Sequence, residues 1–301
     1  MESVTLKIDE ETLNKMKDFY FDCKVIKNNP YIVFACKTSD NIDITIYQSK
    51  HGLKVVFMGE DPLKEASIWN KNASLNDKKE KEEYSWLDIN SQIGSDEVGT
   101  GDFFGPIVVV ASYVSKDIIP FLKQLGVNDS KKLTDKKIME IVPKFIDKVI
   151  YSKLTCDPIK YNEMVSKGYN MNSIKAVLHN EALKNVVSKS HDHHCQIYID
   201  QFCEKSTYYR YLEGKYEPLI DNVNFHIKGE SYYPSVAVSS LIARYSFLLY
   251  FEELNKKYHM TFVKGASSTT DEFALNFKNQ YGIEELNKVC KMNFKNYLLL
   301  K

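Results

Sequence analysis

The chain has 301 residues, of which 44% are apolar and 27% charged, and its 40 basic and 40 acidic side chains cancel to a net charge of zero. This length allows one large domain or two modest ones, and two is the preferred division. No uninterrupted apolar run approaches the roughly 18 residues that a membrane span needs, so a soluble protein is expected. Neutral charge neither indicates nor excludes nucleic acid, because binding to phosphates depends on where lysine and arginine cluster.

The N-terminus and the cysteines indicate a cytoplasmic location. The first residues, MESVTLKIDEET, lack the basic region and apolar stretch of an export signal. The six cysteines lie far apart without a C-x-x-C pair, as expected of free thiols in a reducing compartment. A zinc site is therefore not expected.

The first 70 residues predict a small α+β unit. Residues 4–8 alternate apolar and polar side chains, which is typical of a half-buried strand. Asp9 is a suitable N-cap for a following helix, and Asp61-Pro62 predicts the start of another. Three more strands are predicted between these helices, over residues 31–36, 42–47 and 53–57, the last two joined by a turn at His51-Gly52. The predicted order is β-α-β-β-β-α, with the helices on one side of the sheet.

A polar run of both charge signs follows at residues 71–83. It predicts a linker, which we place at residues 71–88, although a short charged helix is an alternative.

The remaining residues, 89–301, alternate strands and helices as α/β folds do. Strands are predicted at residues 107–114, 150–155 and 196–200. Helices are predicted at residues 171–187 and 235–251, the second buried on most sides, and the chain from Asp271 onward is also expected to be helical.

The glycines of G99-T-G-D-F-F-G105 do not form a dinucleotide or P-loop phosphate site. Those sites need a helix directly after the glycines, so that its N-terminus faces the phosphate. Here the apolar strand at residues 107–114 follows, and no G-K-[ST] closes the run.

Four acidic residues are candidates for a different chemistry, although each taken alone is equally typical of a solvated surface carboxylate. Asp96 and Glu97 lie where one strand ends, Asp200 ends another, and Glu230 precedes the long apolar helix. Carboxylates at adjacent strand ends can converge, and four of them favour hard cations such as Mg²⁺ or Mn²⁺. Neighbouring residues of a strand point to opposite faces, so Asp96 and Glu97 can share a site only if the backbone bends there, which glycines favour.

Several motifs in the same order make the chain resemble bacterial ribonuclease HIII. They are D96-E-V-G-T-G-D-F-F-G-P106, N128-D-S-K-K-L-T-D135, Y161-N-E-M164, N170-M-N-S-I-K-A-V-L-H-N180, I199-D-Q-F202 and V236-A-V-S-S-L-I-A-R244. The resemblance implies an RNase H-like catalytic domain at residues 89–301, with a mixed sheet surrounded by helices. It also implies that residues 1–70 form a substrate-binding domain similar to the TATA-binding protein. The first 90 residues carry a small excess of acidic side chains, so this role depends on the resemblance alone.

The same resemblance implies a monomeric, metal-dependent endonuclease that cuts the RNA strand of RNA–DNA hybrids and leaves 5′-phosphate and 3′-hydroxyl ends. Asp96, Glu97, Asp200 and Glu230 would hold two Mg²⁺ or Mn²⁺ ions. Gly99-Thr100-Gly101 would let the backbone approach the 2′-hydroxyl that distinguishes RNA from DNA, and Lys131 would contact a phosphate. The alternatives are ribonuclease HII-like activity at embedded ribonucleotides, and a protein that binds hybrids without cutting them.

Overall fold

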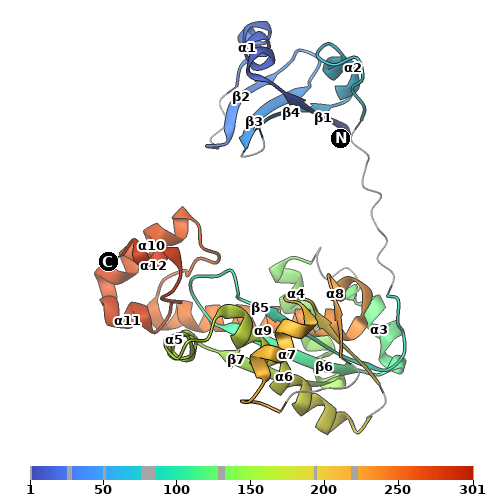
Figure 1. Ribbon diagram of the computed structural model, residues 1–301, viewed down its shortest axis with the longest axis vertical. Helices are drawn as coiled ribbons and strands as arrows, with labels where there is room; N and C mark the ends of the chain where they lie inside the picture. The colour runs from blue at the N-terminus through green and yellow to red at the C-terminus, as the bar shows by residue number, and fades with distance from the viewer. Residues whose placement is uncertain are drawn as a thin grey trace. The chain divides into compact units, whose positions relative to one another are not determined.

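The computed structural model describes residues 2–25, 29–49, 52–75, 86–127, 133–192, 195–217 and 223–300. The chain divides into two compact units, Met1–Glu83 and Tyr84–Lys301 (Figure 1). Most of the predicted linker and His51 of the predicted turn lie outside the described residues.

The first unit is a four-stranded antiparallel sheet with two helices, in the predicted order β-α-β-β-β-α. The strands pair in the order β1-β4-β3-β2. The elements are β1 (Glu2–Ile8), α1 (Glu10–Phe19), a 3₁₀ turn η1 (Phe21–Cys23), β2 (Ile32–Lys37), β3 (Asp43–Ser49), β4 (Gly52–Gly59) and α2 (Pro62–Ser67).

Both helices of this unit begin at the predicted caps and pack on one face of the sheet. The Asp9 side chain accepts a hydrogen bond of 2.8 Å from the Thr12 backbone N–H, and Asp61 caps α2 in the same way. Met16 of α1 and Ala66 of α2 join one core with alternate residues of the strands, such as Ile44. The residues between those alternate positions form the opposite sheet face, and neither α1 nor α2 packs there.

The second unit contains a mixed five-stranded sheet in the order β7-β6-β5-β8-β9. The strands are β5 (Gln92–Val98), β6 (Ile107–Val114), β7 (Ile150–Cys156), β8 (Gln196–Asp200) and β9 (Val223–His226). β5, β6 and β7 pair antiparallel, whereas β5, β8 and β9 pair parallel. The mixed sheet was predicted, but the edge strand β9 was not.

Two long helices cover the two faces of this sheet. α9 (Pro234–Tyr258) packs against one face, where Val108 and Val110 of β6 belong to its core. α6 (Met171–Ser190) packs against the other, together with Val109 and Ala111. This division follows from the alternation of side chains along β6.

The close fit of α9 requires a glycine on β5. A Cβ atom at Gly94 would lie only 2.5 Å from the Val236 backbone nitrogen, so only hydrogen fits there. α9 is long and apolar enough to cross a membrane by length and composition, but 67% of its most apolar window is buried inside the protein. It is the core helix of this unit.

The other elements surround the sheet, and the C-terminal part is helical as predicted, beginning at Ser268. They are η2 (Lys116–Ile118), α3 (Ile119–Gln124), α4 (Asp135–Ile141), η4 (Val142–Lys144), η5 (Ile146–Lys148), α5 (Pro158–Ser166), α7 (Lys205–Leu212), α8 (Gly229–Tyr232), α10 (Ser268–Tyr281), α11 (Ile283–Asn287) and α12 (Lys295–Leu298).

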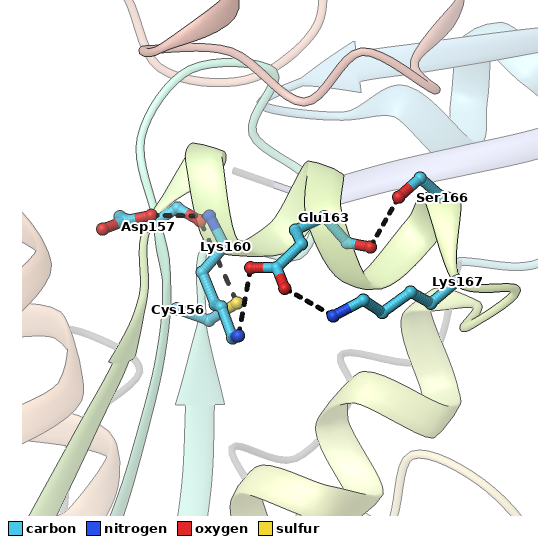
Figure 2. Close-up of polar contacts among 6 residues, drawn as sticks. All are labelled: Cys156, Asp157, Lys160, Glu163, Ser166 and Lys167. Atoms are coloured by element: carbon cyan, nitrogen blue, oxygen red, sulfur yellow. Dashed lines mark hydrogen bonds and ion pairs between the residues drawn. The ribbon is translucent and has the colours of Figure 1, made fainter.

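Helix α5 has one exposed, ion-paired face and one face that holds the C-terminal segment. Figure 2 shows the exposed face, where Glu163 pairs with Lys160 at 3.1 Å and with Lys167 at 2.5 Å. On the other face, the Asn162 side-chain amide donates to the backbone oxygens of Asn287 and Cys290. The motif Y161-N-E-M164 therefore fastens the segment at residues 287–293 to the rest of the second unit.

Candidate active site

The four predicted acids lie around one end of the mixed sheet. The last paired residues of parallel strands β5 and β8 are Ser95 and Ile199, and Asp96 and Asp200 come directly after them. Glu230 follows β9 in the short helix α8, and the Gly229 N–H that precedes it donates to Asp200 Oδ1 at 2.8 Å. Carboxyl ends of parallel strands meet at one edge of a sheet, and this edge holds the acids.

Asp96 and Glu97 leave β5 on opposite faces. β5 stays in register with β6 through Val98, and the Asp96 carboxyl lies near Ser240 of α9, which lowers its pKa, whereas the Glu97 carboxyl bonds to side chains of α6. The turn comes after Val98, at Gly99, whose φ is +92°. The expected bend therefore follows the two acids and does not lie between them, so the prediction that they need a bend to interact was wrong: the charge of Glu97 still reaches the Asp96 carboxyl and raises its pKa.

Electrostatics show that the acids influence one another. Burial, followed by the charges of Glu97 and Asp200, raises the pKa of Asp96 well above its usual value. Burial and the neighbouring Glu230 raise the pKa of Asp200 to about 7. Several carboxyls that oppose one another's ionisation in a buried place form a group that a cation would stabilise.

Glu97 is the exception, because its surroundings favour the ionised form. Burial alone would raise its pKa, but hydrogen bonds and charge from His179 and Lys175 outweigh burial and lower it. Lys175 Nζ and His179 Nε2 each lie 3.0 Å from a different carboxylate oxygen of Glu97.

The donor set suits a hard divalent cation. It offers carboxylate oxygens, the ligands that Mg²⁺ and Mn²⁺ prefer. Within the described ranges, no three His, Cys, Asp or Glu side chains form a ready-made metal cage.

The glycine-rich loop begins beside the acids and is fastened by the C-terminal segment. Lys291 is fully buried, and its Nζ donates to the backbone oxygens of Asp102 at 2.7 Å and Gly105 at 2.8 Å. Burial lowers the pKa of Lys291 to about 8, although the charge of Asp102 opposes this shift. The backbone N–H of Lys291 also donates to the Phe103 oxygen at 2.9 Å, so the loop is held along its length.

The two glycines of G99-T-G101 differ. A Cβ atom on Gly99 would lie 2.0 Å from the Pro106 carbonyl oxygen, whereas one on Gly101 would meet nothing within 4 Å. The backbone at Gly99 therefore requires glycine, and the space around Gly101 does not.

The sequence did not identify Lys175, His179 or Lys291 as residues of the site. One predicted residue, Lys131, cannot be placed. Lys131 lies outside the described residues. A signal for two of them was available in the sequence. Lys175 and His179 are spaced i, i+4 within the predicted helix, where they alternate with core positions such as Ile174 and Val177, and ionisable residues at such positions indicate a buried polar contact. Lys291 carried no local signal.

Comparison with known proteins defines the class. The family model described as Ribonuclease HII matches residues 93–297, and a domain of unknown function, DUF3378, matches residues 3–82. The fold with its acidic sheet edge is thus that of the ribonuclease HII family.

Relatives that match over nearly the full length show which branch of the family the chain belongs to. Ribonuclease HIII of Listeria monocytogenes is 40% identical over 98% of this chain and 97% of its own length, and that of Staphylococcus aureus is 37% identical over 98% and 96%. The crystal structure of Bst-RNase HIII in complex with Mn²⁺ superposes with a TM-score of 0.69, at 33% identity over 99% of both chains. The chain belongs to the ribonuclease HIII branch of this family.

Proposed function

We propose that this chain is a metal-dependent endonuclease that hydrolyses the RNA strand of RNA–DNA hybrids, leaving 5′-phosphate and 3′-hydroxyl ends. One observation carries the proposal: buried carboxyls from two parallel strands and α8 gather at one sheet edge, where burial and neighbouring carboxylates raise the pKa of Asp96 and Asp200. Membership in the ribonuclease HIII family supplies the substrate class. The chain is expected to act as a monomer in the cytoplasm.

Asp96, Glu97, Asp200 and Glu230 are the proposed ligands of Mg²⁺ or Mn²⁺. When bound, two such ions would activate the attacking water and stabilise the leaving oxygen. The protein's own task is to place the carboxylates and to keep Glu97 ionised, which His179 and Lys175 favour.

The glycine-rich loop is proposed to recognise the 2′-hydroxyl of the RNA strand. Gly99 creates the turn directly after the acids, and Gly101 leaves open space in which a sugar can approach the main chain. Thr100 lies between them. A backbone N–H or C=O at this place can bond a hydroxyl that DNA lacks. Lys131 is the proposed phosphate contact on the same substrate.

The first unit, proposed to be the substrate-binding domain at residues 1–70, offers its uncovered sheet face. Thr5 and Val56 are paired on that face, with the buried Thr45 beside Val56, and Lys7, Lys54 and Tyr47 form the neighbouring row. Small uncharged side chains permit close approach to a nucleic acid, and the two lysines can pair with phosphates.

Cleavage and binding measured together on Asp96→Asn test the proposal. The variant removes one carboxylate charge with little change of shape. We expect it to lose cleavage of a long hybrid in Mg²⁺ and in Mn²⁺ while its hybrid affinity stays close to that of the wild type. Retained cleavage would refute the assignment of the acids, and a wild-type protein that binds hybrids without cutting them would refute the enzymatic function.

A further inference from the structure

Two buried side chains, which are not among the proposed metal ligands, hold the Glu97 carboxylate in place. Lys175 and His179 are one turn apart on α6, and each donates to one oxygen of Glu97 at 3.0 Å. The side chain of His179 is 0% exposed, and those of Lys175 and Glu97 are 9% and 11% exposed.

Hydrogen bonds fix the orientation of the His179 ring. Its Nδ1 lies 2.8 Å from Ser95 Oγ, and its Nε2 faces Glu97. A ring that donates its Nε2 N–H to the Glu97 carboxylate satisfies both contacts, because the Ser95 hydroxyl can either donate to Nδ1 or accept from it. Ser95 precedes Asp96 on β5, so the same strand carries the acids and the residue that orients the ring.

Phe202 shields the group from its other side. Its ring stacks on His179 at a centroid distance of 5.1 Å, and Lys175 Nζ lies 4.2 Å from its centroid. An ammonium held both by a carboxylate and by an aromatic face has little freedom to move. The two donors are therefore preformed parts of the site.

We propose that His179 and Lys175 are positioning residues that orient the Glu97 carboxylate for metal binding. Each donor uses one lone pair of one oxygen, and each oxygen keeps a second lone pair that a metal ion can take. Partners of this kind typically contribute 10–100-fold to metal affinity. This inference rests on the proposed role of Glu97 as a metal ligand.

Binding of Mn²⁺ alone, without nucleic acid, tests the inference on the full chain, by loss of the EPR signal of the free ion. We expect His179→Leu to weaken Mn²⁺ binding about 10–100-fold. His179→Gln keeps an amide donor that can face Glu97 and should recover part of the affinity. Lys184→Met is the matched control on α6, because Lys184 pairs with Glu181 at 3.5 Å on a more exposed part of the helix.

Lys175→Met separates positioning from simple charge repulsion. If Lys175 acted only through its positive charge, its removal would tighten Mn²⁺ binding, whereas loss of an anchor weakens it. We expect weaker binding in Lys175→Met and affinity within about twofold of the wild type in Lys184→Met, a surface change. Tighter binding in Lys175→Met would overturn the role of that residue.

The same titration distinguishes failure of this inference from failure of the proposed function. Asp96→Asn must lose the Mn²⁺ site of the wild type. If the wild type shows no such site, the proposed function fails. If the site exists and folded His179→Leu binds Mn²⁺ as the wild type does, only the positioning inference fails. Should His179→Leu not fold, Ser95→Ala replaces it, with weakened binding expected and unchanged binding contradicting the inference.

Discussion

Substitution of Gly99 by alanine should destabilise the catalytic unit. Two costs combine, because the φ of +92° disfavours any side chain and the new Cβ would lie 2.0 Å from the Pro106 carbonyl oxygen. A non-glycine residue in such a conformation costs roughly 1–3 kcal/mol. Pro106 is rigid and leads into β6, so relief of the clash must move backbone, and we expect a total loss of about 2–4 kcal/mol in the free energy of unfolding.

Gly168→Ala is a control for the conformational cost alone. Gly168 has a similar φ of +88°, but a Cβ atom there meets nothing within 4 Å. This variant should lose only about 1 kcal/mol. Chemical denaturation of both variants measures the difference, and equal losses would show that the contact with Pro106 does not decide the choice of glycine at residue 99.

Gly101→Ala should leave the stability of the protein nearly unchanged but slow the cleavage of a hybrid. Its Cβ meets no atom of the protein and its φ lies outside the left-handed region, so stability should change by less than about 0.5 kcal/mol. If a ribose approaches the main chain here, the added methyl displaces it, and a misplacement of about 1 Å can cost about 10²-fold in rate. Single-turnover cleavage of a hybrid is the assay. A wild-type rate in Gly101→Ala would refute the proposed backbone contact with the 2′-hydroxyl.

Three further outcomes are expected. The buried Lys291 releases its proton at about pH 8 in the folded protein but near its ordinary value of 10.5 in the unfolded chain, so the unfolded state binds more protons between these values and stability rises with pH. Relative to Lys291→Met, the wild type should gain about 2 kcal/mol between pH 7.5 and 10 by chemical denaturation, and a constant difference would contradict the shifted pKa. Deletion of residues 1–80 should weaken hybrid binding more than it slows single-turnover cleavage, and unchanged affinity would refute the substrate-binding role. Lys131→Ala should reduce the slope of log affinity against log salt by about 1, and an unchanged slope would exclude a phosphate contact.

Local patterns predicted most elements of the fold because their signals lie within the element itself. Side-chain alternation gave β1 to β4, and Asp9 and Asp61 gave the start of α1 and α2. β9 escaped prediction because only Val223 of its four residues is buried, so it lacks a strong apolar pattern. Its place in the sheet comes from pairing with β8, which is a tertiary contact.

The acids of the candidate site could be named from the sequence, whereas their surroundings could not. Asp96 and Glu97 form an adjacent pair before glycines, and the order of several motifs connected them to Asp200 and Glu230. The bonds from Lys175 and His179 to Glu97 join residues about 80 positions apart in the chain. A helix pattern shows that such residues share a face, but not which strand that face meets.

The same limit applies to the glycine-rich loop. The sequence showed that glycines follow the acids, and it excluded a phosphate cradle because a strand comes next. It did not show that a lysine near the C-terminus fastens the loop. Lys291 contributes a buried charge bonded to two carbonyl oxygens, and only the packing of the C-terminal segment on α5 brings it there.

The proposed function can be tested by cleavage of a long RNA–DNA hybrid, compared with a DNA duplex containing one ribonucleotide, each in Mg²⁺ and in Mn²⁺. If the acidic edge of the sheet cuts RNA within hybrids, the long hybrid is cut rapidly with 5′-phosphate ends, and the single ribonucleotide is cut much more slowly. Cutting only at the single ribonucleotide would identify ribonuclease HII-like activity instead, and no cutting of either substrate in either ion would show that the protein is not a ribonuclease H.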